Sequence, residues 1–297
     1  MAGRRLIPCV FITNHVFQQI SEPELEALVQ NTARALSNVG AQFPTADFKE
    51  YQFDCDWTAG TRAAFFRFLK KIRPLLPPGC RISATIRLHQ YKFPDRTGLP
   101  PVDRGMLMLY NTGDIDDPLG GNSIFQAADA EKYLNGAPAN FPLPLDLALP
   151  IFSWALVYRD GALWKIIPEP DLTELQDTSR FQLQTPNSKL QTPNSKLQTP
   201  NSKLQTPNSK LQTPNFKLQT PNFKLLQSTY LGGHYLRPGD WLRLETVDTA
   251  LLRQAARLAA RADLAPDARL AFFHLDTAAM RRYPPIFLKS VCETIEK

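Results

Sequence analysis

The chain has 297 residues, 43% of them apolar, and a formal net charge of +6. This length fits one large domain with a sizeable core, and no window approaches the 18 or more uncharged apolar residues of a membrane span. Six of the 34 basic residues are lysines of an internal repeat that contains no acid, and the other 28 equal the 28 acidic residues in number. Charge therefore gives no support for a nucleic-acid partner.

Predicted strands and helices alternate along the first part of the chain. Residues 6–13 (LIPCVFIT) are short, apolar and β-branched, which is typical of a buried strand. Ser21 and Glu24 have the spacing of a capping box and open a helix. The next predicted elements are a strand over 51–57, a helix over 61–72, a strand over 82–89, a proline-broken connection over 90–105 and a strand over 106–111.

The later part continues the alternation. We expect a helix over 123–133, a strand over 147–154, a hairpin over 155–167 turning at Asp160-Gly161, a helix over 249–262 and a strand over 270–276. Strands alternating with helices predict a parallel α/β sheet. A complete (β/α)8 barrel needs eight strands. The six barrel-type strands predict an α/β fold, a TIM-type barrel that is incomplete and carries a small hairpin insertion.

Residues 183–224 are six consecutive heptapeptides, four LQTPNSK and two LQTPNFK. Proline every seven residues excludes a continuous helix, and one leucine per unit cannot build a deep core. We expect a flexible, disordered surface insertion; a seven-residue solenoid and a basic adhesive segment are the alternatives. The predicted organisation is therefore 1–182 for the first part of the barrel with its hairpin, 183–224 for the repeat and 225–297 for the last part.

The cysteines and the N-terminus carry no recognisable motif. The spacing of Cys9, Cys55, Cys80 and Cys292 fits neither a zinc site nor a redox pair, and we expect no metal and no cofactor. The first residues contain two arginines but no long apolar stretch followed by a cleavage site, so they do not predict a signal peptide.

Two carboxylates lie close together on the strand YQFDCDW. Alternation places Gln52, Asp54 and Asp56 on one face and Phe53, Cys55 and Trp57 on the other. Like charges this close raise one pKa, which suits general acid–base chemistry, and active sites of barrels lie at the C-terminal ends of their strands. We predict Asp54 and Asp56 as catalytic residues; structural salt bridges inside the barrel are the alternative.

Further polar and aromatic side chains follow neighbouring strands. Ser83, Thr85, Arg87 and His89 would share one face of the strand over 82–89, where Arg87 can neutralise an aspartate or form a purely structural ion pair. Trp154 either stacks on a sugar or packs under a loop, and Asp276 either reaches the site or caps a helix at Thr277. The predicted substrate-binding residues are Trp57, Arg87, His89, Tyr110, Asn111, Trp154 and Asp276.

These segments together resemble glycoside hydrolase family 18, the chitinase-like barrels. The family's D-x-x-D-x-D-x-E motif falls on Tyr51, Asp54, Asp56 and Thr58. MLMLYN is similar to the family's M-x-Y-[DN] strand, and LALPIFSW to its G-x-P-[FY] strand. The resemblance implies a mechanism in which the glutamate protonates the glycosidic oxygen and the neighbouring aspartate orients the acetamido group of the substrate.

The chain departs from this pattern in two ways. Thr58 replaces the acid and cannot protonate a leaving group, and the alignment makes 6–13 the family's third strand, so the first two βα units are missing. We expect a truncated product, a misassigned start or a chain that needs a partner for its exposed edges.

A second resemblance covers most of the chain outside the repeat. The phrases TRAAFFRFLK, SATIRLHQ, PPVDRGMLM and LPLDLALPIFSW look like an uncharacterised bacterial protein family that is exported or envelope-associated. We predict a glycoside-hydrolase-like barrel acting on a polysaccharide or oligosaccharide; the alternatives are a non-catalytic glycan-binding barrel and a nonfunctional truncated remnant.

Overall fold

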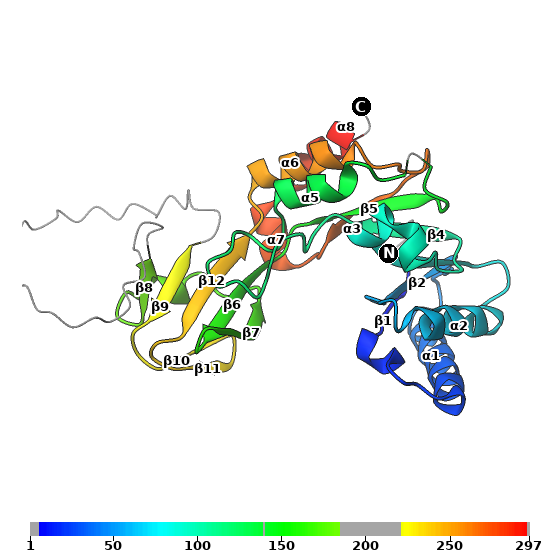
Figure 1. Cartoon of the computed structure of the whole chain (residues 1–297), viewed down its shortest axis with the longest axis horizontal. Helices are drawn as coiled ribbons and strands as arrows, with labels where there is room; N and C mark the ends of the chain where they lie inside the picture. The colour runs from blue at the N-terminus through cyan, green and yellow to red at the C-terminus, as the bar shows by residue number, and fades with distance from the viewer. Residues whose placement is uncertain (1–5, 139, 185–220, 296–297) are drawn as a thin grey trace, which may run out of the picture. The chain divides into compact units, whose positions relative to one another are not determined.

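The computed structural model describes residues 6–138, 140–184 and 221–295 (Figure 1). The chain divides into two compact units. Unit 1 consists of Met1–Thr112, Phe125–Ile151 and Thr249–Lys297, and unit 2 of Gly113–Ile124 and Phe152–Asp248. No helix in the described part of the chain is both long enough and apolar enough to cross a membrane.

Unit 1 contains one six-stranded sheet in the order β1-β2-β3-β4-β5-β13, and every neighbouring pair is parallel. All six strands predicted from the sequence are present, and the parallel α/β sheet is confirmed. Such a sheet is consistent with part of a (β/α)8 barrel. The strands are β1 Cys9–Phe11, β2 Glu50–Asp54, β3 Arg81–Arg87, β4 Arg104–Met108, β5 Leu145–Pro150 and β13 Leu270–Phe273.

Helices pack against this sheet through apolar side chains. The predicted periodic face of α2 is confirmed, since Ala64, Phe65, Phe68, Leu69 and Ile72 are all buried. The capping box of α1 also forms, with the Ser21 amide donating to Glu24 at 2.8 Å. The helices are α1 Glu22–Gln42, α2 Arg62–Ile72, α3 Leu88–Lys92, α4 Pro94–Thr97, α5 Ala127–Leu134, α6 Thr249–Ala259, α7 Thr277–Arg282 and α8 Pro285–Ile295.

All six predicted strands end earlier than expected, and two of these early ends move a predicted site residue off the sheet. The strand predicted over 82–89 ends at Arg87, because the side chain of Gln90 accepts the Arg87 amide at 2.8 Å and starts helix α3. The strand predicted over 147–154 ends at Pro150, and Ser153 begins a strand of unit 2. The predicted positions of His89 and Trp154 on barrel strands are therefore wrong.

Charged side chains occupy the end of the sheet where the strands begin. Arg269, which precedes β13, donates to Glu50 of β2 at 2.8 Å and also pairs with Asp146 of β5. Arg104 of β4 pairs with the same aspartate at 2.7 Å. Glu50 and Asp146 are almost fully buried, so they need these cations to offset their desolvation. This network neutralises the charges at that end of the sheet.

Unit 2 is built on a five-stranded antiparallel sheet in the order β7-β6-β12-β9-β8. The predicted hairpin is confirmed: Asp160 and Gly161, with φ of 52° and 84°, form the turn between β6 and β7. Positive φ at both central residues is what a two-residue hairpin turn of type I′ requires. The strands of this unit are β6 Ser153–Arg159, β7 Ala162–Pro168, β8 Phe181–Gln184, β9 Asn222–Leu225, β10 Thr229–Leu231, β11 His234–Leu236 and β12 Trp241–Thr246.

Both ends of the heptapeptide repeat belong to this sheet. Leu183 and Gln184 of the first unit pair with Phe223 and Asn222 of the last. Phe223 is only 4% exposed and lies in the apolar cluster of unit 2, so the last repeat contributes to the core of this unit. The prediction of a flexible insertion otherwise falls on residues 185–220, which lie outside the described residues.

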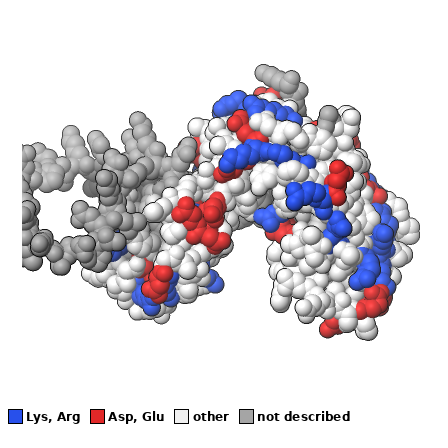
Figure 2. Space-filling model, in the orientation of Figure 1, with Lys and Arg blue, Asp and Glu red and all other residues white. Residues whose placement is uncertain are grey.

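The charged side chains on the surface are mixed in sign. On the face shown in Figure 2, acidic and basic groups are interspersed over the described residues. The described surface also carries exposed ion pairs, such as Lys71 with Glu22 at 3.0 Å and Arg261 with Glu131 at 3.1 Å. This distribution agrees with the neutral charge that the sequence has outside the repeat.

Candidate functional site

The two aspartates at the end of β2 have different partners on β3. Asp54 is the last residue of β2, and Asp56 follows it on the same face. The Thr85 hydroxyl donates to Asp54 Oδ1 at 2.7 Å, and Arg87 Nη1 lies 3.1 Å from Asp56 Oδ2. The polar row of β3 thus meets the polar row of β2, as the alternation predicts for Thr85 and Arg87.

These aspartates line a cavity of about 240 Å³ in unit 1. Asp54, Asp56, Arg87, Tyr110 and Asn111, all predicted as site residues, lie in its wall together. The complete lining consists of Phe11, Asp54, Asp56, Arg87, Met108, Tyr110, Asn111 and Phe273. We call it the acidic cavity. It lies at the carboxyl ends of β2, β3 and β4, where barrel active sites are found.

The environment of the cavity favours the protonated form of two of its groups. Burial is the main cause that raises the pKa of Asp54, and the charge of Asp56 adds to it; the hydrogen bond from Thr85 and the charge of Arg87 oppose it. Burial also raises the pKa of the Tyr110 hydroxyl, and the charges of Asp54 and Asp56 act in the same direction. Asp54 is therefore a proton donor over a wider pH range than an exposed aspartate.

Aromatic rings complete the wall of the acidic cavity. Tyr110 stacks on Phe273 with ring centroids 5.6 Å apart and an interplanar angle of 13°. Phe11 on β1 and Phe273 on β13 are 65% and 48% exposed, so each keeps apolar surface in contact with solvent. Asn111 has a φ of 53°, a left-handed conformation that asparagine tolerates better than most residues.

Sequence reasoning missed three of the lining residues. Phe11 could have been found from the parallel register, since it is the partner of Asp54 across β1 and β2. Met108 of β4 was not among the predicted site residues. On the strand predicted over 270–276, Asp276 was the candidate site residue, but Phe273 is the residue that lines the cavity. The short apolar strand gave no signal for choosing between its two faces.

Trp57 and His89 line a different cavity. Its volume is about 430 Å³, and its wall consists of Trp57, Thr58, Ala59, His89, Phe93, Arg96, Thr97 and Tyr133. We call it the aromatic cavity. Trp57 is 2% exposed and donates its indole N–H to the Thr97 carbonyl at 3.1 Å. Burial, followed by the charge of Arg87, lowers the pKa of His89, which favours the neutral imidazole.

Thr58 also faces away from the acidic cavity. Its backbone amide donates to the Thr61 hydroxyl at 2.9 Å, and its own hydroxyl lies 3.3 Å from the same oxygen. The residue aligned with the family's acid is therefore a neutral side chain in the wall of the aromatic cavity. Asp54 and Asp56 are the two carboxylic acids among the residues that line the acidic cavity.

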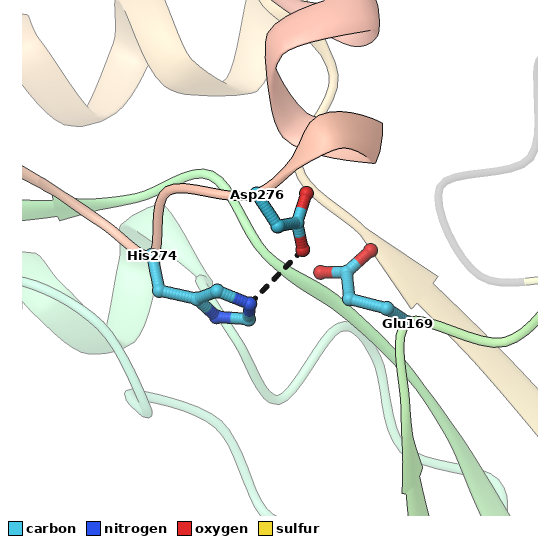
Figure 3. Close-up of side chains that lie close together, drawn as sticks. All are labelled: Glu169, His274 and Asp276. Atoms are coloured by element: carbon cyan, nitrogen blue, oxygen red, sulfur yellow. Dashed lines mark ion pairs between the residues drawn. The ribbon is translucent and has the colours of Figure 1, made fainter.

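The last two predicted site residues line neither cavity. Trp154 lies on β6 in unit 2 and donates its indole N–H to Glu245 at 2.6 Å. Asp276 caps helix α7 by accepting the Ala279 amide at 2.6 Å, as the structural alternative predicted. The imidazole of His274 points at Asp276, with Nε2 3.0 Å from its carboxylate (Figure 3). The capping bond and this contact hold the pKa of Asp276 below its usual value.

The residues in the wall of the acidic cavity do not form a metal site. A structural or catalytic metal is usually held by at least three His, Cys, Asp or Glu side chains. The lining contains Asp54 and Asp56 alone of these types, and Arg87 already occupies one carboxylate. This donor set can form hydrogen bonds and exchange protons.

No protein-family model matches the chain, and no curated protein matches it. Among solved structures, it is similar to the Bacillus cereus spore cortex-lytic enzyme SleL, with 15% identity, a TM-score of 0.48, and coverage of 97% of this chain and 59% of that one. A class V chitinase from Pseudomonas fluorescens Pf-5 shows 15% identity and a TM-score of 0.48, covering 99% and 81%. The chitinase RmChi1 from Rhizomucor miehei shows 12% identity and a TM-score of 0.42, covering 97% and 84%.

The chain spans less than two thirds of the length of SleL. All three TM-scores lie below 0.5 and all three identities below 25%. These structural similarities therefore do not establish an activity for the chain. Its membership of a chitinase-like family stays a prediction.

Proposed function

We propose that unit 1 binds a polysaccharide in the acidic cavity and acts on it as a glycoside-hydrolase-like enzyme. The observation that carries the proposal is the convergence of Asp54, Asp56, Arg87 and Tyr110 in one wall at the carboxyl ends of parallel strands. Two acids at this edge of a barrel-type sheet, one with a raised pKa, are what glycosidic proton transfer requires.

The wall of the cavity fits a sugar ring. A pyranose has hydroxyl groups around its edge and apolar C–H groups on its faces. The aspartates, Tyr110 and Asn111 supply hydrogen-bonding groups, and the exposed rings of Phe11 and Phe273 supply apolar surfaces. A mixture of a few polar groups with aromatic surface is typical of small-ligand sites.

Asp54 is the acid in the proposed reaction. In its protonated form it transfers a proton to the glycosidic oxygen as the bond to the anomeric carbon breaks. A water molecule adds to that carbon and gives its proton to the carboxylate of Asp56, so the net change is the addition of one water across the bond. Arg87 positions Asp56 and balances its charge.

A non-catalytic glycan-binding site is the second candidate. Thr58 aligns with the catalytic acid of glycoside hydrolase family 18, which the sequence resembles, and its side chain lines the aromatic cavity. Asp56 is engaged by Arg87 at 3.1 Å. Both observations favour a site that holds a glycan without cleaving it.

Turnover and binding measured on the same protein separate the two candidates. A panel of chromogenic glycosides reports hydrolysis, and calorimetry with chito-oligosaccharides reports binding. Hydrolysis predicts a loss of turnover of about 100-fold or more in Asp54→Asn and in Asp56→Asn. Asp129→Asn, which removes a carboxylate from α5 that lies outside both cavities and pairs with Lys132 at 2.6 Å, is the matched control.

The outcomes are distinct. Binding that both cavity variants weaken, without turnover on any glycoside, supports the second candidate and rejects the first. Absence of both binding and turnover in the wild-type chain, or equal effects of Asp129→Asn and the two cavity variants, rejects both.

A further inference from the structure

The aromatic cavity is a second concave site in unit 1 that the proposed hydrolysis does not use. Its volume of about 430 Å³ lies within the range of roughly 300–1,000 Å³ that is typical of small-molecule sites. Trp57, Phe93 and Tyr133 contribute aromatic surface to its wall, and His89, Arg96 and Thr58 contribute polar groups.

The aromatic cavity differs from the acidic cavity in charge. None of the residues that line it is acidic, whereas two aspartates line the other. Its one guanidinium, that of Arg96, lies 5.5 Å from the centre of the Phe93 ring. The wall therefore presents one positive charge, that of Arg96, on an aromatic support, which favours an anionic group.

Arg96 has no acidic partner in the described part of the chain. Its guanidinium contacts the Phe93 ring, while its backbone carbonyl accepts Arg62 Nη1 at 3.1 Å and is thereby held in place. An arginine without a carboxylate, set in the wall of a cavity, can bind a carboxylate in bidentate geometry. This feature separates Arg96 from arginines such as Arg87, Arg104 and Arg269, which are all paired with acids.

Residues from the same two chain segments, 56–57 and 87–89, line both cavities. Asp56 lines the acidic cavity and Trp57, the next residue, lines the aromatic cavity. Arg87 likewise lines the acidic cavity and His89 the aromatic cavity, because helix α3 begins directly after Arg87. Residues that follow one another in the sequence thus alternate between the two cavities.

We propose that the aromatic cavity binds a carboxylate-bearing sugar, a uronic acid of the polysaccharide, with its carboxylate on Arg96 and its ring against the aromatic wall. This inference rests on the proposed function and narrows its substrate class to acidic polysaccharides. The His89 imidazole and the Thr58 hydroxyl, both in the wall, can supply hydrogen bonds to the ring hydroxyls.

Titration of the full chain with matched monosaccharides, followed by NMR at the Trp57 indole N–H, tests this directly. The probes are methyl β-D-glucuronide and methyl β-D-glucoside, which differ only in the carboxylate, and sodium acetate, which has the carboxylate but no ring. We expect the glucuronide to bind about tenfold more tightly than either other probe, as one charge-assisted pair implies. Arg96→Gln removes this preference, Arg96→Lys retains part of it, and Arg67→Gln, an exposed arginine of α2 outside both cavities, leaves it unchanged.

Three results overturn the inference: equal binding of glucuronide and glucoside by the wild-type chain, an undiminished preference in Arg96→Gln, or acetate binding as tightly as the glucuronide. Failure of the proposed function has a different signature, because it is measured with neutral chito-oligosaccharides and the variants of Asp54 and Asp56. One combination of results separates the two proposals. If the preference for the glucuronide depends on Arg96, but substitution of Asp54 or Asp56 does not change the binding of neutral glycans, the uronic-acid site is supported and glycan binding in the acidic cavity is rejected.

Discussion

The hydroxyl of Thr85 donates to Asp54 Oδ1 at 2.7 Å across the neighbouring strands β2 and β3. This bond stabilises the ionised carboxylate and lowers its pKa, but burial outweighs it and the net direction is upward. The environment of Asp54 therefore disfavours its charge at neutral pH. Such a cost is expected at sites of proton transfer, where an ordinary carboxylate would be ionised too readily.

Replacing Asp54 with asparagine should stabilise unit 1 at neutral pH. A carboxyl group with a folded pKa above its unfolded value favours the folded state below the unfolded pKa, near 3.8, and loses that contribution as pH rises through the folded value. Asparagine keeps an oxygen that accepts from Thr85 and carries no charge. We expect Asp54→Asn to raise Tm by about 2–4 °C at pH 7, with a smaller difference at pH 3.5, as measured by calorimetry. A larger gain at pH 3.5 than at pH 7 would contradict the raised pKa.

Loss of the cation beside Asp56 should change the titration of Asp54. The charge of Arg87 lowers the pKa of Asp54, and that of Asp56 raises it. Arg87→Gln removes the first influence and leaves the second unopposed, so we expect the pKa of Asp54 to rise further. Carbon-detected NMR of the aspartate side chains across a pH series measures the shift. Arg67→Gln serves as the comparison, and the prediction fails if both variants give the same titration curve as the wild type.

Much of the acidic cavity could be predicted because period-two alternation sorts side chains reliably within a strand. The segment FDCDW placed Asp54 and Asp56 on one face and Trp57 on the other, and the structure divides them in this way between two cavities. Since neighbouring parallel strands end at the same edge, Arg87 and Tyr110 could also be expected beside them.

The predictions failed where a strand ended for a reason that alternation does not contain. His89 does not share the face of Arg87, because the Gln90 side chain accepts the Arg87 amide and a helix begins there. Trp154 follows a break between Pro150 and Ser153, beyond which the chain enters another sheet. Because residues 147–154 are almost all apolar, the sequence did not indicate that they belong to two different strands.

The structural position of Trp154 predicts a role in stability. Its indole N–H donates to Glu245 at 2.6 Å, and the same carboxylate accepts from Ser123 and pairs with the buried Arg243. Trp154→Phe keeps most of the ring but leaves this buried acceptor with one bond fewer. We expect a loss of about 1–2 kcal/mol in the free energy of unfolding, measured in urea, with glycan affinity unchanged. Trp164→Phe, at a 40% exposed position of the same unit, should cost less; a selective loss of glycan binding in Trp154→Phe would instead support its predicted substrate-binding role.

The two forms of the heptapeptide differ at one position, and the last repeat shows why that position matters. Phe223, the sixth residue of its unit, is 4% exposed on β9 and packs in the apolar cluster of unit 2 with Phe181 and Leu225. Phe223→Ser converts this repeat into the LQTPNSK form and leaves a cavity beside a hydroxyl. We expect a loss of about 3–5 kcal/mol in the stability of unit 2, followed by urea unfolding and by the near-ultraviolet circular dichroism of its tryptophans. Lys224→Ser changes an exposed residue of the same strand and is the control. It should unfold like the wild type, and equal destabilisation by both substitutions would refute the assignment of the last repeat to the sheet.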